Sequence, residues 1–177
     1  MSGKSLLIFC SSSFNIDQEF NEEARKVVRA VSSKGYGIVS GGVVKGTMGV
    51  VADEAGKSGL GNVGVIPRFL GNVVHPLLSE VIWTDTMSER KERMREAGPD
   101  VALALPGGVG TMDELFETLT LAKLGKYEGK VIAYNFKGFY DVLKKMMDNF
   151  LETGMIDSHT RELIHFPENI DQLLEIL

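Results

Sequence analysis

A glycine-rich turn between two predicted elements is the clearest chemical feature of the sequence. The segment Pro106–Thr111 reads PGGVGT and directly follows an apolar run of strand length. Glycines allow close backbone approach, and the free N–H groups of a following helix carry partial positive charge that favours a phosphate. The structural alternative is a sharp strand-to-helix turn with a helix cap. One glycine would suffice for such a turn, so this alternative does not explain why three are present. We therefore expect Gly107, Gly108 and Gly110 to cradle a phosphate.

Thr111 and Glu114 form the pattern T-x-x-E, which is typical of a helix capping box. In that arrangement Thr111 begins the helix beside the phosphate, and Glu114 bonds back to the Thr111 backbone, so its carboxylate points toward the glycine turn. The turn matches neither common nucleotide loop, because it lacks the third glycine of G-x-G-x-x-G and the Lys-Ser/Thr of a P-loop. The motif therefore predicts an anion site of a less common kind.

Two further loops follow predicted strands and are candidates for the same ligand site. Gly41 and Gly42 open the segment GGVVKGTMG, which lies between a predicted strand and a predicted helix. They are expected either to cradle a ligand or only to give a sharp turn and close helix–sheet packing. Ser12 belongs to a run of serines after the first predicted strand. Its hydroxyl is expected to cap the next helix or to contact a base or ribose.

The segment Met87–Lys91 opens another predicted helix and reads MSERK. Arg90 and Lys91 lie in its first turn, where cations oppose the positive end of the helix dipole. An anionic ligand would offset that cost, so Met87, Arg90 and Lys91 are predicted to lie near the ligand. A solvated, charged helix face is the structural alternative.

The composition excludes several classes of function. The chain of 177 residues has a formal net charge of −5, which argues against binding to nucleic acids. Its single cysteine, Cys10, excludes an internal disulfide framework and fits a reducing cytoplasm. No signal peptide is expected, and no stretch approaches the ~20 apolar residues of a membrane span. The scattered histidines predict no metal site, and no cofactor is expected.

Apolar runs of strand length alternate with amphipathic segments from end to end. Most runs are solidly apolar, as expected for strands covered on both faces. We predict strands at Ser5–Cys10, Tyr36–Ser40, Asn62–Ile66, Val81–Thr84, Val101–Leu105, Lys130–Asn135 and Leu163–Phe166. We predict helices at Asp17–Lys34, Thr47–Ser58, Met87–Ala97, Thr111–Leu124, Phe139–Glu152 and Glu168–Ile176. The alternation predicts a Rossmann-like α/β fold over residues 1–177: one domain with a doubly wound parallel sheet in three αβα layers.

Taken together, the motifs resemble those of a known enzyme family. Pro106–Glu114 fits P-G-G-x-G-T-x-x-E and Met87–Lys91 fits M-x-E-R-K, as in the LONELY GUY family of phosphoribohydrolases, once labelled lysine decarboxylases. The resemblance covers nearly the whole chain. It implies a homodimer of Rossmann-like subunits that hydrolyses the N-glycosidic bond of adenine-type nucleoside 5′-monophosphates to free base and ribose 5-phosphate. In plants and many microbes the base is a cytokinin, an N6-substituted adenine.

The resemblance also implies roles for individual residues. By motif position, Arg90 and Glu114 would be the essential polar pair, and the glycine turn would hold the phosphate. A carboxylate such as Glu114 stabilises the oxocarbenium-like ribosyl cation of glycosidic cleavage. Arg90 would contact either the phosphate or the departing base, and both assignments stay open. The chain departs from the family at Ser11, Val43, Val44 and residues 121–123, which weakens the prediction of cytokinin specificity more than that of glycosidic chemistry.

Two other functions are alternatives to the phosphoribohydrolase, and the first is a non-catalytic carrier. Related Rossmann-like proteins carry molybdenum cofactor or sense nucleotides without catalysis, but a pure carrier has no need of the Arg90–Glu114 pair. The second, a pyridoxal-phosphate decarboxylase, fails because the chain is too small and the sequence has no recognisable Schiff-base lysine motif.

The predicted helix after the glycine turn bears on the oligomeric state. Its apolar residues spread over more of the helix than one core-facing stripe requires, which is consistent with a subunit interface. Complete burial inside one chain is the alternative explanation. The residues concerned are Leu115, Phe116, Leu119 and Leu121.

Overall fold

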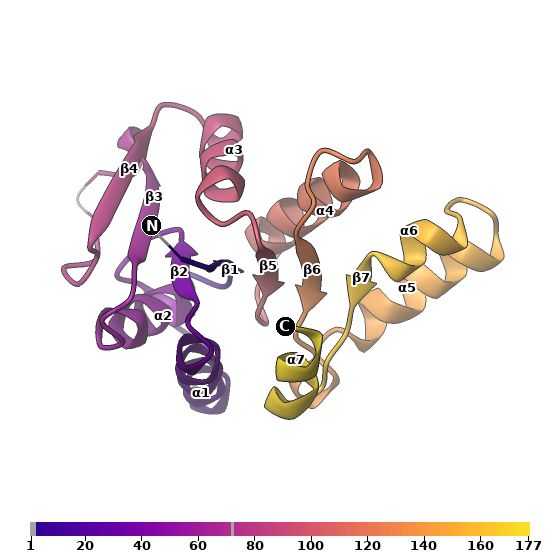
Figure 1. Ribbon diagram of the computed structural model, residues 1–177, viewed down its shortest axis with the longest axis horizontal. Helices are drawn as coiled ribbons and strands as arrows, with labels where there is room; N and C mark the ends of the chain where they lie inside the picture. The colour runs from indigo at the N-terminus through magenta and orange to yellow at the C-terminus, as the bar shows by residue number, and fades with distance from the viewer. Residues whose placement is uncertain (1–2, 72) are drawn as a thin grey trace.

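A sheet of seven parallel strands forms the centre of the protein (Figure 1). The computed structural model describes residues 3–71 and 73–177. Its strands are β1 (Ser5–Phe9), β2 (Gly37–Ser40), β3 (Asn62–Pro67), β4 (Glu80–Thr84), β5 (Val101–Ala104), β6 (Lys130–Ala133) and β7 (Ile164–His165). Their order is β4-β3-β2-β1-β5-β6-β7, and each neighbouring pair is parallel. The predicted doubly wound α/β fold is therefore confirmed.

Helices cover both faces of the sheet and complete three layers (Figure 1). One face carries α1 (Gln18–Ser33), α2 (Gly46–Gly56) and α7 (Ile170–Ile176). The other carries α3 (Met87–Ala97), α4 (Val109–Lys123) and α5 (Asp141–Glu152). The short helix α6 (Ser158–Glu162) and the 3₁₀ turns η1 (Arg68–Leu70) and η2 (Phe136–Gly138) lie in connections. None of the described helices has both the length and the apolar character needed to cross a membrane.

The central strands are apolar along their whole length because helices cover both of their faces. Leu6, Leu7 and Ile8 of β1 are completely buried. Successive side chains point to opposite faces of a sheet, so Leu6 and Ile8 pack in the layer of α1 and Leu7 packs in the layer of α4. The solid apolar runs of the sequence therefore have the cause that was predicted for them.

The apolar residues of α4 pack inside the chain. Leu115 and Leu119 are buried, and Phe116 and Leu121 are partly buried against the same core. This burial accounts for their wide spread around the helix without a subunit interface. The predicted homodimer therefore depends on the family resemblance alone.

Local hydrogen bonds at the ends of elements explain both the boundaries that were predicted well and those that were not. Asp17 caps α1 by accepting a bond from the Glu19 N–H, and Gly35 ends the helix region with a φ of +86°. The last helix was predicted two residues too early, because Asn169 caps α7 instead of Pro167 starting it. The predicted strand through Asn135 ends earlier at β6, since the Asn135 side chain turns the backbone by accepting from the Tyr140 N–H.

The strand order reverses at β1 and β5, which are neighbours in the sheet. The chain leaves β1 for α1 on one face and leaves β5 for α4 on the other. A crevice at the carboxyl ends of the strands is the usual ligand site of such a sheet. The loops that follow β1, β2, β3 and β5 meet there.

Candidate active site

A cleft of about 560 Å³ opens at this crevice, beyond the carboxyl ends of β1 and β5. Its walls come from the loops after β1, β2 and β3 and from the first turns of α3 and α4. The cleft brings together most residues that the sequence predicted for the site. These are Ser12, Met87, Arg90, Gly108, Gly110, Thr111 and Glu114.

The glycine turn ends in a helix whose first amides are free. Gly108 is the N-cap of α4, and it offers no side chain to satisfy the amides of the first turn. Within the described residues, the N–H groups of Val109, Gly110 and Thr111 donate to no acceptor of the chain. All three residues line the cleft. Free amides at a helix N-terminus suit an anion, so the geometry fits the predicted phosphate cradle.

The predicted capping box is wrong. The helix begins at Val109, so Thr111 is its third residue, and the Met112 N–H bonds to the carbonyl of Gly108. The Thr111 side chain is buried and packs against Gly107, where a Cβ atom would overlap its hydroxyl. The carboxylate of Glu114 finds a partner on another helix instead of the Thr111 backbone. A tertiary ion pair has replaced the local bond that the pattern indicated.

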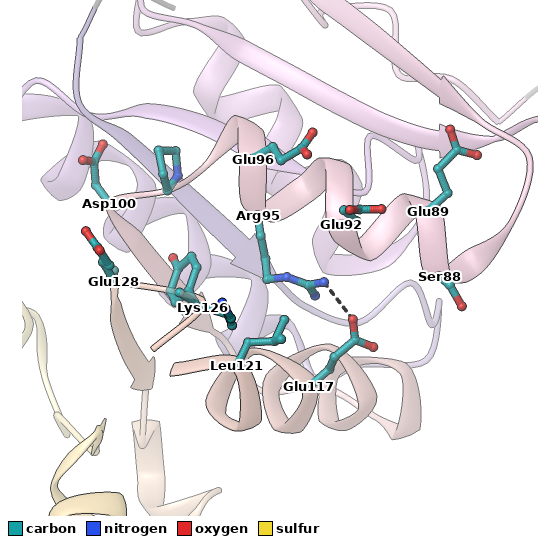
Figure 2. A pocket seen from close by; sticks show the side chains of 13 residues that line it. Ser88, Glu89, Glu92, Arg95, Glu96, Asp100, Glu117, Leu121, Lys126 and Glu128 are labelled. Atoms are coloured by element: carbon teal, nitrogen blue, oxygen red, sulfur yellow. Dashed lines mark ion pairs between the residues drawn. The ribbon is translucent and has the colours of Figure 1, made fainter. Parts of the chain in front are cut away.

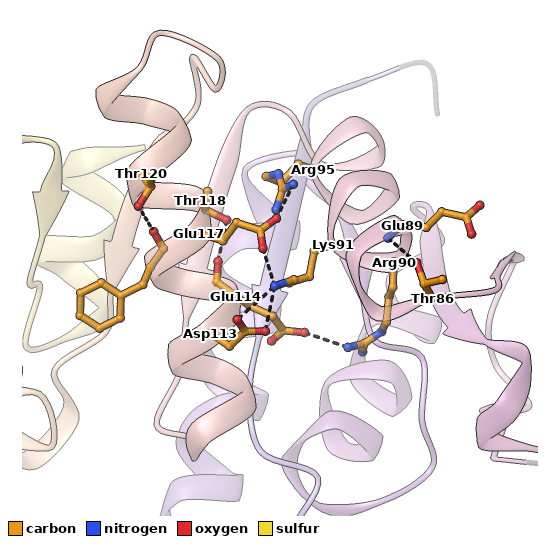
Figure 3. A network of polar contacts seen from close by, with 11 residues as sticks. Thr86, Glu89, Arg90, Lys91, Arg95, Asp113, Glu114, Glu117, Thr118 and Thr120 are labelled. Carbon is orange, nitrogen blue, oxygen red and sulfur yellow. Dashed lines mark hydrogen bonds and ion pairs between the residues drawn. The ribbon is translucent and has the colours of Figure 1, made fainter.

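That partner is Arg90 of α3 (Figure 3). Its Nη1 group donates to Oε1 of Glu114 at 3.0 Å, and its Nε donates to the carbonyl oxygen of Val65 at 3.0 Å. Arg90 and Glu114 are only 6% and 5% exposed. Charges buried this deeply are tolerated when they are paired and hydrogen-bonded, as these are. The pair lies in the wall of the cleft beside the free amides of α4.

Burial raises the pKa of Glu114 to about 7. The Arg90 guanidinium opposes that shift in pKa, and the neighbouring Asp113 carboxylate adds to it. Near neutral pH the carboxyl group therefore exchanges between its neutral and ionised forms. Cys10 also lines the cleft, and burial together with the nearby Glu114 raises the pKa of its thiol. The thiol is therefore neutral and is a poor nucleophile.

Gly41 leaves room for the Arg90 side chain. A Cβ atom at Gly41 would overlap the Arg90 Nη2 atom and lie 2.6 Å from the Met48 sulfur. Gly42 has a φ of +67° and packs closely on Gly64 of β3. Neither glycine is among the residues that line the cleft. Their positions match the packing alternative stated for this loop, with Gly41 acting on the site through Arg90.

Lys91 extends from α3 toward α4 (Figure 3) and is not among the residues that line the cleft. Its Nζ donates to Oδ1 and Oδ2 of Asp113 at 3.0 Å each and also contacts Glu117. The cost of a cation in the first turn of α3 is therefore offset by carboxylates of the protein itself. The structure brings Lys91 next to the predicted pair without placing it in the cleft wall.

Sequence reasoning missed Lys45, which lines the cleft at the N-cap of α2. Its Nζ lies 5.7 Å from the centre of the Phe14 ring. Among the described residues, no carboxylate forms an ion pair with it, in contrast to Arg90 and Lys91. An exposed lysine in a loop carries no spacing signal, so only its place directly before a helix could have singled it out.

A second and larger hollow, of about 950 Å³, lies outside this cleft (Figure 2). It runs along α3 toward the connection between α4 and β6, and it contains neither Arg90 nor Glu114. Six acidic and two basic residues line it, and one of the basic residues, Arg95, is paired with Glu117. A surface with this excess of carboxylates repels a phosphate. The smaller cleft is therefore the candidate active site.

Comparison with known proteins agrees with the motifs. A family model described as "Possible lysine decarboxylase" matches residues 48–177. A cytokinin riboside 5′-monophosphate phosphoribohydrolase of Arabidopsis thaliana, LOG2, is 33% identical over 97% of this chain and 81% of its own. The chain belongs to the LONELY GUY family. A second LONELY GUY relative, the phosphoribohydrolase of the same name from Mycobacterium tuberculosis, is 34% identical over 94% of this chain and 89% of its own.

Solved structures show how widely the fold of this LONELY GUY protein occurs. The molybdenum cofactor binding protein of Rippkaea orientalis has a TM-score of 0.75 at 15% identity, over 99% of this chain and 96% of that chain. The Moco carrier protein of Chlamydomonas reinhardtii has a TM-score of 0.72 at 14% identity, over 98% and 94%. At such low identity these likenesses concern the fold alone.

The raised pKa of Glu114 predicts how stability depends on pH. A carboxyl group whose pKa rises from 4.5 to about 7 on folding binds its proton more tightly in the folded state. The stabilisation that this tighter proton binding gives the folded state is complete below pH 4.5 and is lost as pH rises through 7. Relative to Glu114→Gln, the wild type should lose about 3 kcal/mol of unfolding free energy across that range. Urea unfolding of both chains at a series of pH values measures this, and a constant difference would contradict it.

Gly41→Ala should destabilise the protein by disrupting the buried ion pair. The new methyl group displaces the Arg90 guanidinium and leaves Glu114 buried without its partner, which costs about 3 kcal/mol. Chemical unfolding of the single variant measures that cost. In an Arg90→Met/Glu114→Gln chain, the same Gly41→Ala change should cost less than half as much. Equal costs in both backgrounds would assign the effect to Met48 instead.

Proposed function

We propose that this protein hydrolyses the N-glycosidic bond of adenine-type nucleoside 5′-monophosphates and releases the free base and ribose 5-phosphate. The observation that carries the proposal is the buried Arg90–Glu114 ion pair, which lies in one cleft with the free amides of α4. A binding protein for a phosphate needs the amides alone. The carboxyl group, with a pKa of about 7, adds a group that suits catalysis near neutral pH. Membership of the LONELY GUY family supports the same reaction.

In this proposal the amides of the first turn of α4 bind the phosphate. Val109, Gly110 and Thr111 offer three adjacent N–H groups, and the helix dipole favours negative charge there. Ser12 offers a hydroxyl from the loop after β1, which lines the same cleft. Lys45 adds the one cleft-lining cation for which the described residues provide no carboxylate partner. The phosphate then anchors the nucleotide and takes no part in bond breaking.

The reaction itself takes place at the ribose. The bond between C1′ and the base nitrogen breaks, and its electron pair leaves with the base while the ribose becomes oxocarbenium-like. Ionised Glu114 stabilises this cation across the cleft. Water adds its oxygen to C1′, and one of its protons ends on the base nitrogen. Arg90 holds the carboxylate in place through Nη1, and its Nη2 group, which lies against Gly41, donates no hydrogen bond within the described residues.

Apolar side chains favour an adenine with an apolar N6 substituent, as in a cytokinin nucleotide. Val43, Leu70 and Val73 line the cleft from the loops after β2 and β3, and Met87 and Val109 line it from α3 and α4. Such a wall stabilises a hydrocarbon substituent on N6 more than it stabilises the unsubstituted amino group, which prefers contact with water. A homodimer, as the family resemblance implies, completes the proposal.

The decisive test is release of free base from purified protein. The protein is incubated with AMP, N6-isopentenyl-AMP, GMP and the nucleosides that lack phosphate, and products are separated by chromatography. We expect base and ribose 5-phosphate from at least one adenine-type monophosphate and little from the nucleosides. Glu114→Gln should keep the fold at lower stability, because Arg90 loses its partner, and should lose at least ~100-fold in kcat, because the ribosyl cation loses its counter-charge. Tight nucleotide binding without cleavage would indicate a carrier and contradict the proposal.

Lys45→Met should weaken binding of the monophosphate without slowing its cleavage. Loss of one solvent-accessible cation from a phosphate site should raise KM about fivefold and leave kcat nearly unchanged. The matched control is Lys57→Met, which removes a lysine at the other end of α2, where it pairs with Glu54. An equal rise in KM for both variants would indicate only long-range attraction. An unchanged KM for Lys45→Met would exclude Lys45 from phosphate binding.

A further inference from the structure

Lys91 and Arg95 of α3 are bound by two carboxylates of α4 (Figure 3). Lys91 donates to both oxygens of Asp113 and contacts Glu117, and Arg95 lies 2.8 Å from the second oxygen of Glu117. The Lys91 side chain is only 10% exposed, so these bonds are partly shielded from water. Lys91 follows Arg90 in the sequence and Asp113 precedes Glu114. The network therefore joins the same two helices, one residue away from the catalytic pair.

We propose that Lys91 is a positioning residue: it clamps α4 to α3 so that Glu114 meets Arg90, and it offsets the charge of Asp113 beside Glu114. Its ammonium group already has carboxylate partners, and it is not among the residues that line the cleft. A direct phosphate contact would require Lys91 to leave both partners. The proposal rests on the proposed function for its kinetic test, but its electrostatic part is tested without any substrate.

The charges around Glu114 show why this compensation matters. Arg90 and Lys91 face it from α3, Asp113 adjoins it on α4, and the Cys10 thiol faces it from the end of β1. Burial and Asp113 raise the pKa of Glu114, while Arg90 and Lys91 lower it. The thiol of Cys10 is neutral and adds no charge. Lys91 thus acts on Glu114 both directly and by cancelling Asp113.

Lys91→Met should move the pH dependence of the reaction to higher pH. Without the lysine, Asp113 is uncompensated, the ionised form of Glu114 is less favourable, and its pKa rises further. In a plot of kcat against pH, the acidic limb should move to higher pH by about half to one pH unit. At pH values below the midpoint of that limb, kcat should therefore fall ~3- to 10-fold. At pH 9, where Glu114 is ionised in both chains, the loss of kcat should be at its smallest and should reflect only the missing clamp, with KM for the monophosphate unchanged.

Three matched variants separate this effect from simple loss of stability. Arg95→Met removes the other cation on Glu117 and should lower stability without moving the limb. Lys91→Met/Asp113→Asn removes the uncompensated carboxylate and should move the limb most of the way back. Lys91→Arg keeps the charge and the contacts, and it should retain the wild-type profile. The proposal is overturned if Lys91→Met leaves the limb in place, or if its main effect is a raised KM for nucleotides but not for nucleosides.

A direct titration makes the test independent of catalysis. In protein with ¹³C-labelled glutamate, the carboxyl resonance of Glu114 is assigned as the signal lost in Glu114→Gln, and its midpoint is followed with pH. The midpoint should rise in Lys91→Met and fall back in Lys91→Met/Asp113→Asn. If these shifts occur in a protein that cleaves no nucleotide, the proposed function fails while the electrostatic role of Lys91 stands. Unchanged midpoints would overturn that role whatever the activity.

Discussion

The buried ion pair between Arg90 and Glu114 is the interaction on which the site depends. Neither charge is tolerated at this depth alone, so α3 and α4 have to dock with the two side chains in contact. The surrounding sequence serves this requirement. Gly41 has no side chain where the guanidinium lies, and the carbonyl oxygen of Val65 accepts a hydrogen bond from the Arg90 Nε group. The helices before and after β5 are thereby fixed to each other across the carboxyl end of the sheet.

Because carboxylates of the protein hold Arg90 and Lys91, the proposed anion site would depend mainly on backbone amides, with Lys45 as the one cleft-lining cation for which the described residues provide no carboxylate partner. Arg90 and Lys91 are held by carboxylates, and the chain as a whole carries a net negative charge. The first turn of α4 supplies free amides in the cleft, and these carry partial positive charge without any titratable group. In the proposed reaction, the two requirements of a glycosidic site, an anchored phosphate and a carboxylate near C1′, would be met by different parts of one helix. One turn of α4 separates Gly110 from Glu114.

The sequence predicted what local physics decides and missed what tertiary contacts decide. The helix between Asp17 and Gly35 was placed within one residue at each end because both of its boundary signals act locally. The T-x-x-E pattern at Thr111 failed because the helix begins two residues earlier, at Val109, and because Glu114 pairs with the buried Arg90 of another helix. The position of Lys45 in the cleft wall had no signal in sequence spacing at all. Residue types and motif spacing predicted most residues of the candidate cleft, whereas the partners of each charge required the packed structure.

The shared fold leaves the chemistry open, since proteins named for molybdenum cofactor binding have a closely similar arrangement of elements. What favours catalysis here is the protonation balance of Glu114. A carboxylate stabilises a ribosyl cation most strongly where water is excluded, yet the same burial raises its pKa and reduces the ionised fraction. Nearby cations restore that fraction, but a cation too close would compete with the ribosyl cation for the carboxylate. In the proposed reaction, holding Arg90 on one oxygen of Glu114, with the second cation, Lys91, bound to Asp113, would reconcile the two requirements.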